Sequence, residues 1–183
     1  VAVLVEDMSV HLCAPAVVVA DAVARVGLSY TYSDGYLSDP YKLFDKRPDT
    51  HGSVALSLGY RQFMVFPDAS LQVDYRYYED SWDTKSHTLE VGWAQNLPRS
   101  LFTPYLRYYS QSETSFYSVT SSTIATHHAD DYRLSSYGAF TLGARWSIAL
   151  SEHWTLELEA ERYKTGAGWG LYDGNEAPGL VNF

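Results

Sequence analysis

The sequence predicts an all-β protein, an antiparallel up-and-down transmembrane β-barrel with about eight strands in this fragment of a larger barrel. Three observations predict this fold. Seven segments alternate apolar with polar or small residues, at the two-residue period of a half-buried strand. The links between these segments alternate between longer and shorter ones, and aromatic residues gather where the segments end.

Each predicted strand places apolar side chains on one face and polar, charged or small side chains on the other. In the first strand, Val26 and Leu28 alternate with Arg25, Gly27 and Ser29. No stretch of comparable strength has the period of a helix. The seven strands are expected at residues 23–32, 53–63, 71–78, 88–94, 102–109, 140–146 and 154–163.

The lengths of the connections indicate how the strands are oriented. In outer-membrane barrels the periplasmic turns are short and the extracellular loops are long. Tight turns are expected at residues 66–68, 96–100 and 151–153. The longer links are expected at residues 33–50, 79–85, 112–131 and 164–179.

The chain contains 16 Tyr, 5 Trp and 7 Phe, and these residues are sorted by their position along the strands. Amphipathic rings favour the two membrane–water interfaces, so a membrane barrel is expected to carry two aromatic belts. The repeated Arg-Tyr-Tyr at 76–78 and 107–109 is interpreted as part of one belt rather than as a ligand platform. The belt residues are expected to be Tyr30, Tyr32, Tyr77 and Tyr108 at the long-loop end, and Trp93, Phe102, Trp146 and Trp154 at the short-turn end.

The apolar rows carry almost no charge, so they are expected to face lipid while the opposite rows face the lumen. The interior of a small barrel is just wide enough for side chains, and buried charges there must be paired. Arg162 is an exception, because strict alternation puts it on the lipid face. Two explanations stay open: its side chain snorkels to the outer headgroups, or a bulge shifts the register. The lumen charge network is expected to contain Arg61, Asp74, Arg76, Glu90, Arg107, Arg145, Glu157, Glu159 and Glu161.

Composition excludes several classes of protein. A formal net charge of −9 argues against nucleic acid as a partner, because phosphates demand a basic surface. A mean hydropathy of −0.23 and the lack of a long apolar run exclude a transmembrane helix. They do not exclude a membrane barrel, because apolar and polar residues alternate along its strands and their hydropathies cancel in the mean.

Residues 1–20 are left unassigned, and residues 21–183 are expected to form one barrel domain that is truncated at both ends. The segment 14–20 resembles part of a leader peptide, but Glu6 and Asp7 precede it where positive charge is expected. A leader, vector sequence and a further strand remain open. Cys13 is interpreted as a stray thiol outside the strands. The four residues 180–183 are too few for an eighth crossing, which needs about 9–11.

The best candidates for chemistry lie in one Ser/Thr-rich loop, and they are His127, His128, Asp130 and Asp131. Outer-membrane proteases of the omptin type use Asp and His at the barrel rim, so a rim-active hydrolase is the alternative function. Catalysis needs oriented partners, and none is visible in the pattern, so solvated loop residues are expected. No metal site and no cofactor are predicted.

Six motifs, taken together and in order, carry a family resemblance. They are SDGYLSDPYK at 33–42, RPD at 47–49, DYRYY at 74–78, SHTLE at 86–90, LRYYSQS at 106–112 and DYRLS at 131–135. Over about residues 26–183 the chain resembles the C-terminal half of a bacterial outer-membrane barrel family known as domain of unknown function number thirty-five seventy. The resemblance implies the fold and the location, and it supplies no catalytic residues.

Together these observations predict a non-enzymatic, porin-like barrel in a Gram-negative outer membrane, acting as a narrow conduit or a structural barrel with a charged lumen. Its expected partners are outer-membrane lipid and lipopolysaccharide, and not nucleic acid. A soluble lipocalin-like barrel that binds a ligand inside is a second alternative, and it would stay monomeric without detergent.

Overall fold

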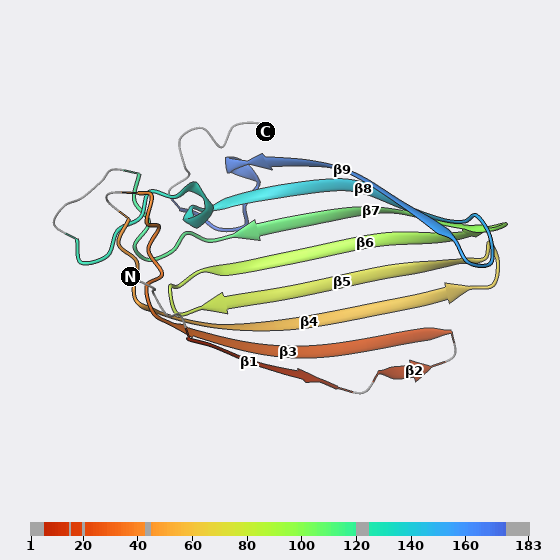
Figure 1. Ribbon diagram of the computed structural model, residues 1–183, viewed down its shortest axis with the longest axis horizontal. Coiled ribbons are helices and arrows are strands. Elements are labelled where there is room, and N and C mark those ends of the chain that lie inside the picture. The colour runs from red at the N-terminus through yellow and green to blue at the C-terminus, as the bar shows by residue number, and fades with distance from the viewer. Residues whose placement is uncertain (1–5, 15, 20, 43–44, 120–124, 175–183) are drawn as a thin grey trace.

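A computed structural model describes residues 6–14, 16–19, 21–42, 45–119 and 125–174, which form one antiparallel sheet of nine strands (Figure 1). Each main strand pairs with its neighbour in the chain, so the all-β, up-and-down fold is confirmed. The strands are β1 (Glu6–Cys13), β2 (Val17–Val19), β3 (Ala22–Asp34), β4 (Thr50–Met64), β5 (Ala69–Asp80), β6 (Lys85–Leu97), β7 (Ser100–Gln111), β8 (Tyr137–Ala149) and β9 (Thr155–Gly166). Two 3-10 turns, η1 (Tyr132–Leu134) and η2 (Ala167–Trp169), lie in the connections.

All seven predicted strands exist, and they correspond to β3–β9. All seven are longer than predicted, because backbone pairing continues into the polar residues beside the turns. Glu79 pairs with Lys85, for example, and their side chains form an ion pair at 3.5 Å. Only residues 81–84 then remain between β5 and β6, as many as in the tight turn 65–68. The expected longer link at this position was therefore wrong, whereas the loops at residues 35–49 and 112–136 are long.

Strand β1 lies in the segment that the sequence left unassigned. It pairs with β3 from Glu6↔Asp34 to Cys13↔Gly27. Met8, Val10 and Leu12 continue one apolar row of the sheet, and Cys13 falls in the opposite row. The placement of Cys13 outside the strands was therefore wrong.

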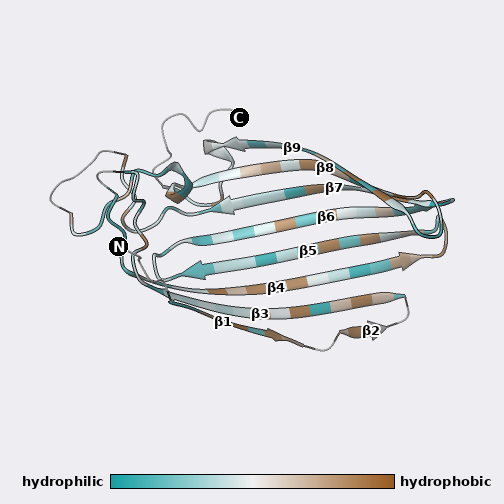
Figure 2. Cartoon of the chain, viewed as in Figure 1, coloured by the Kyte–Doolittle hydropathy of each residue, from teal (hydrophilic) through white to brown (hydrophobic). Residues whose placement is uncertain are grey.

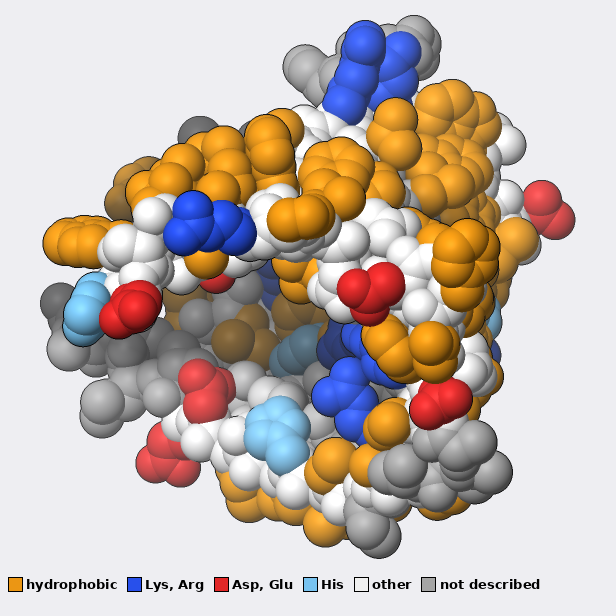
Figure 3. All heavy atoms as spheres, turned by 90° about the vertical axis from the view of Figure 1, so that its right-hand side faces the viewer, with side chains coloured by type: hydrophobic (Ala, Val, Ile, Leu, Met, Phe, Trp, Pro, Cys, Tyr) orange, Lys and Arg blue, Asp and Glu red, His pale blue; other side chains and the backbone are white. Residues whose placement is uncertain are grey.

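The two faces of the sheet differ in chemistry. Bands of hydrophobic and hydrophilic residues alternate along the strands (Figure 2). At the tight-turn end, hydrophobic side chains surround the molecule and Lys, Arg and His side chains are seen in its hollow (Figure 3). We call the outer, hydrophobic face of the sheet the convex apolar face, and the face that lines the hollow the concave polar face. Leu142, 65% exposed, illustrates how open the convex face is.

The aromatic residues predicted to form the two belts lie toward the two ends of the strands. On the convex face, the rings of Phe102 and Trp146 meet edge to face at 6.3 Å near the tight turns. The rings of Tyr108 and Phe140 meet at 4.9 Å in the long-loop half. By register, the remaining belt candidates of the long-loop half are Tyr30, Tyr32 and Tyr77, and those of the tight-turn end are Trp93 and Trp154.

Within the described part of the chain, the sheet has two edges, β1 and β9. The segment considered for a further descending crossing, residues 180–183, lies outside the described residues. No helix in the described ranges has the length and apolar character needed to cross a membrane.

Candidate functional site

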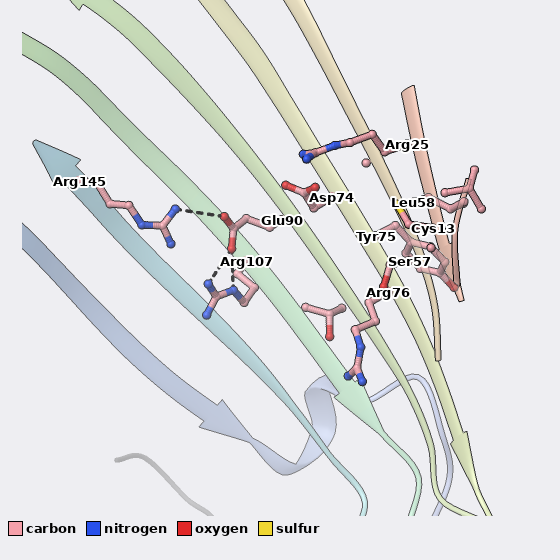
Figure 4. Close-up of a pocket in the computed structure, with 14 residues that line it drawn as sticks. Cys13, Arg25, Ser57, Leu58, Asp74, Tyr75, Arg76, Glu90, Arg107 and Arg145 are labelled. Atoms are coloured by element: carbon pink, nitrogen blue, oxygen red, sulfur yellow. Dashed lines mark hydrogen bonds and ion pairs between the residues drawn. The ribbon is translucent and has the colours of Figure 1, made fainter. Parts of the chain in front are cut away.

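A cavity of about 480 Å³ opens on the concave face, between β1 and β8 (Figure 4). Register explains why charged side chains meet there. One cross-strand row runs Arg25↔Gly59↔Asp74↔Glu90↔Arg107, so five neighbouring strands contribute one residue each at one height. Residues in such a row lie about 5 Å apart across the strands, which is within reach of long side chains.

Tyr105 is the centre of the first charge cluster. It is only 3% exposed, and its hydroxyl lies 3.0 Å from Glu159 Oε1 and 2.9 Å from Glu161 Oε2. Its single proton is therefore shared between two carboxylates. The Arg145 guanidinium lies 4.3 Å from the centre of the Tyr105 ring and donates from Nε to Glu159 at 2.8 Å. The Tyr105 hydroxyl thus bridges the carboxylates of Glu159 and Glu161, and the Arg145 guanidinium lies beside them.

Glu90 extends this cluster across the sheet. The Arg107 guanidinium donates to it from Nε at 2.8 Å, with Nη2 at 2.7 Å, and Arg145 Nη1 lies 3.6 Å away. Separately, Arg61 pairs with Asp74 at 2.7 Å. These contacts neutralise much of the charge on the concave face.

Arg25 and Arg76 differ from the other arginines that line the cavity. Arg25 lies beside Asp74 and Gly59, yet no carboxylate of the described residues is within ion-pair distance of it. The Arg76 guanidinium lies 5.4 Å from the centre of the Tyr78 ring, and it too has no ion pair in that part of the chain. These two guanidiniums are therefore available to an anion that enters the cavity.

The register puts every residue of the predicted lumen network on the concave face. Glu157 is the outlying member. It lines a neighbouring cavity of about 390 Å³ beside Arg145 and forms no ion pair with any described residue. The predicted lumen network did not include Tyr105, the residue at the centre of the cluster. The network was chosen from charged residues in the polar rows, and a tyrosine is uncharged.

The loop candidates divide into two exposed and two buried residues. His127 is exposed, and Asp130 forms an open pair with Lys42 at 3.2 Å. His128 is 4% exposed and Asp131 is 1% exposed, so the expectation of solvated side chains was wrong for these two. Both are buried because the loops at 35–49 and 112–136 pair with each other, through two backbone hydrogen bonds between Lys46 and His128.

Asp131 is held by two arginines. Arg133 Nε donates to both carboxylate oxygens at 3.0 Å, and Arg47 Nη2 lies 3.2 Å from Oδ2. Arg47 also pairs with buried Asp45 at 2.7 Å. Burial alone would raise the pKa of Asp131, but the side-chain and backbone hydrogen bonds from Arg133, with its charge, lower that pKa to about 2.

These contacts define the role of the loop cluster. The Asp131 carboxylate is bound by Arg133 and Arg47, and no hydrogen bond joins it to a histidine of the described residues. His128 Nε2 has no hydrogen-bond partner among the described residues. No group of three or more His, Cys, Asp or Glu side chains suited to a metal ion occurs in the same part of the chain. The arrangement joins the two long loops to each other, and we call the joined segments 45–47 and 128–133 the loop lid.

The loop lid should loosen in acid. The lowered pKa of Asp131 means that its charge stabilises the closed lid above about pH 4, the ordinary carboxyl range, and that this contribution disappears as the pH falls toward 2. We expect a loss on the order of 2 kcal/mol across that window. Hydrogen exchange of the His128 amide, measured against pH, should show the change in wild type. Asp131→Asn should lack it; an equal change in both would contradict the assignment.

The sequence patterns missed a second polar group at the long-loop end. His51 Nε2 lies 3.1 Å from Asp80 Oδ2, and the Tyr78 hydroxyl donates to the same oxygen at 3.0 Å. The other oxygen of Asp80 accepts from the backbone N–H groups of Trp82 and Thr84, both at 2.9 Å. Asp80 therefore shapes the turn 81–84. The register Ser53↔Asp80 places His51 on the same face and would have revealed the pair.

The fold and the site define the class of this protein as an all-β, up-and-down sheet with one apolar face and one ion-paired face. A family model described as "Protein of unknown function (DUF3570)" matches residues 6–180, and the chain belongs to this family. The match includes β1, which the resemblance over residues 26–183 did not. A search of curated proteins and a search of solved structures each found no match.

Proposed function

We propose that this chain forms part of a transmembrane β-barrel in a Gram-negative outer membrane, whose concave face lines a narrow conduit for small solutes. The observation that carries the proposal is the contrast between the faces. The convex face exposes rows of large hydrophobic side chains, and the concave face carries ion-paired charges. Soluble monomers rarely expose contiguous apolar surface of this extent, whereas lipid covers it at no cost.

The dimensions of the strands agree with a bilayer. The strands β3–β9 have 12 to 15 residues. At about 3.3 Å per residue, a 12-residue strand is roughly 40 Å long, and a tilt of about 45° reduces its height to roughly 28 Å. The hydrocarbon core of a bilayer is about 30 Å thick.

The concave face supports a conduit for small polar solutes and no enzymatic activity. Arg25 and Arg76 line the cavity without ion pairs among the described residues. A rim hydrolase would need His127 or His128 oriented by a carboxylate, but the buried Asp131 is bound to arginines. A lipocalin-like cup would need an apolar interior, and this interior carries charges.

Planar-bilayer recording tests the conduit. The wild-type protein should fractionate with outer membranes, need detergent to stay monomeric, and conduct small ions. Arg76→Gln should lower the anion-to-cation permeability ratio by roughly twofold or more, because it removes an unpaired lumenal charge. Arg99→Gln, in the turn between β6 and β7, is the matched control and should leave the ratio unchanged.

Three outcomes would contradict the proposal. A monomer that is stable without detergent would favour the soluble alternative. Membrane-inserted protein that never conducts would favour a plugged, structural barrel. Peptide or lipid hydrolysis that disappears when His127 and His128 are changed to Ala would favour the hydrolase.

A further inference from the structure

Two cations interrupt the apolar convex face near the end of β9. Arg162 and Lys164 are both exposed and lie two residues apart, so they share one face. The pairing of β8 with β9 is continuous from Gly138↔Gly166 to Ala149↔Thr155, so no bulge turns Arg162 inward. Neither cation forms an ion pair with any residue that the structure describes.

The pair borders a groove of about 320 Å³ whose other walls are apolar. Across the strand, Arg162 pairs with Leu142 and Lys164 pairs with Phe140. Leu106 and Trp169 complete the lining. A cationic rim above an apolar floor is the arrangement that an amphipathic anion requires, because its charge and its hydrocarbon need different surroundings.

The Trp169 wall of the groove is fixed by specific contacts. Tyr108 Oη donates to the Trp169 carbonyl at 2.7 Å, and the Leu171 N–H donates to Ser110 Oγ at 2.8 Å. The Trp169 ring meets Phe140 edge to face at 5.6 Å.

Two glycines make room for this wall. A Cβ at Gly138 would overlap the Trp169 carbonyl, and a Cβ at Gly166 would lie 2.6 Å from the Trp169 ring. The segment 167–171 therefore crosses the convex face of β7 and β8 in a defined position.

We propose that this groove binds a lipid through its phosphate headgroup, with Arg162 and Lys164 contacting the phosphate and an acyl chain lying along Leu106, Phe140 and Leu142. The inference rests on the proposed membrane location, in which the long-loop end of β9 lies at the outer headgroup level. Phosphate is favoured by charge complementarity with two unpaired cations. Lipid is favoured over free phosphate because an inorganic ion would leave the apolar floor uncovered.

Native mass spectrometry of the purified chain in micelles tests the groove, with bisphosphorylated lipid A as the probe. Arg162→Gln with Lys164→Gln should weaken binding by at least about tenfold, since each cation near a headgroup contributes about fivefold. Arg99→Gln, a cation in the tight turn at the opposite end of the strands, should bind within about twofold of wild type. Dephosphorylated lipid A should bind wild type as weakly as the double variant binds lipid A. Excess inorganic phosphate should not displace the bound lipid.

Each contrary outcome has a separate meaning. Equal lipid A binding by wild type and the double variant, in protein that inserts into vesicles, would overturn the groove and leave the membrane barrel intact. Displacement by inorganic phosphate would overturn the lipid assignment. A chain that does not insert into vesicles at all would overturn the proposed function and this inference with it.

Discussion

Replacing Asp131 with Asn should open the loop lid, raising hydrogen exchange at the His128 and Lys46 amides roughly 100-fold, which corresponds to about 3 kcal/mol. Removing one partner of a buried ion pair leaves the other charge uncompensated. Here Arg133 would lose its carboxylate partner, and Arg47 would keep its pair with Asp45 alone. The two amides report the opening directly, because they form the backbone pair that joins the loops.

Asp131→Asn removes the carboxylate charge and keeps the N-cap hydrogen bond that this residue makes. Asp131 also accepts a hydrogen bond from the Arg133 N–H at 3.0 Å as the N-cap of η1, and Asn is an equally good cap. Asp130→Asn is the matched control next in the chain. Its pair with Lys42 is solvent-exposed, so its loss should cost less than about 1 kcal/mol. Similar exchange rates in the two variants would show that Asp131 does not hold the lid closed.

The strands and their faces were predictable because the two-residue period is a local signal. The sequence predicted which row carries the charges of β4–β9, and it placed Arg162 on the convex face. Strand β1 was missed because Glu6 and Asp7 begin it, and because the apolar segment 14–20 follows it and resembles a leader. The period through Met8, Val10 and Leu12 was present, but three apolar residues are a weak signal beside those two features.

The loop contacts were not predictable, because they depend on residues that are far apart in the chain. Asp131 pairs with Arg47, which lies in the other long loop. No periodicity links a residue of one irregular loop to a residue of another, so composition alone suggested solvated side chains. For the same reason, the register that joins His51 to Asp80 became visible only once β4 and β5 were paired.

The position of Tyr105 also depends on a residue far away in the chain, Gly143. We expect Gly143→Ala to lower the free energy of unfolding by about 2–3 kcal/mol. Gly143 pairs with Tyr105 across β7 and β8, and the tyrosine ring occupies the space where a Cβ would stand. The ring is only 3% exposed, so it has nowhere to move without leaving Glu159 and Glu161. Urea unfolding in micelles or vesicles measures the change.

A matched glycine and a compensating substitution test this explanation. Gly27 lies in the same concave face, and the nearest atoms to a Cβ there are 3.9 Å away, so Gly27→Ala should be neutral or slightly stabilising. Tyr105→Ala in the Gly143→Ala background should cost less than it does in wild type, because the ring and the methyl group compete for one space. Additive losses would mean that the glycine matters for the strand backbone alone. A coupling of at least about 1 kcal/mol would instead identify the contact between the Tyr105 ring and the new methyl group as the source of the loss.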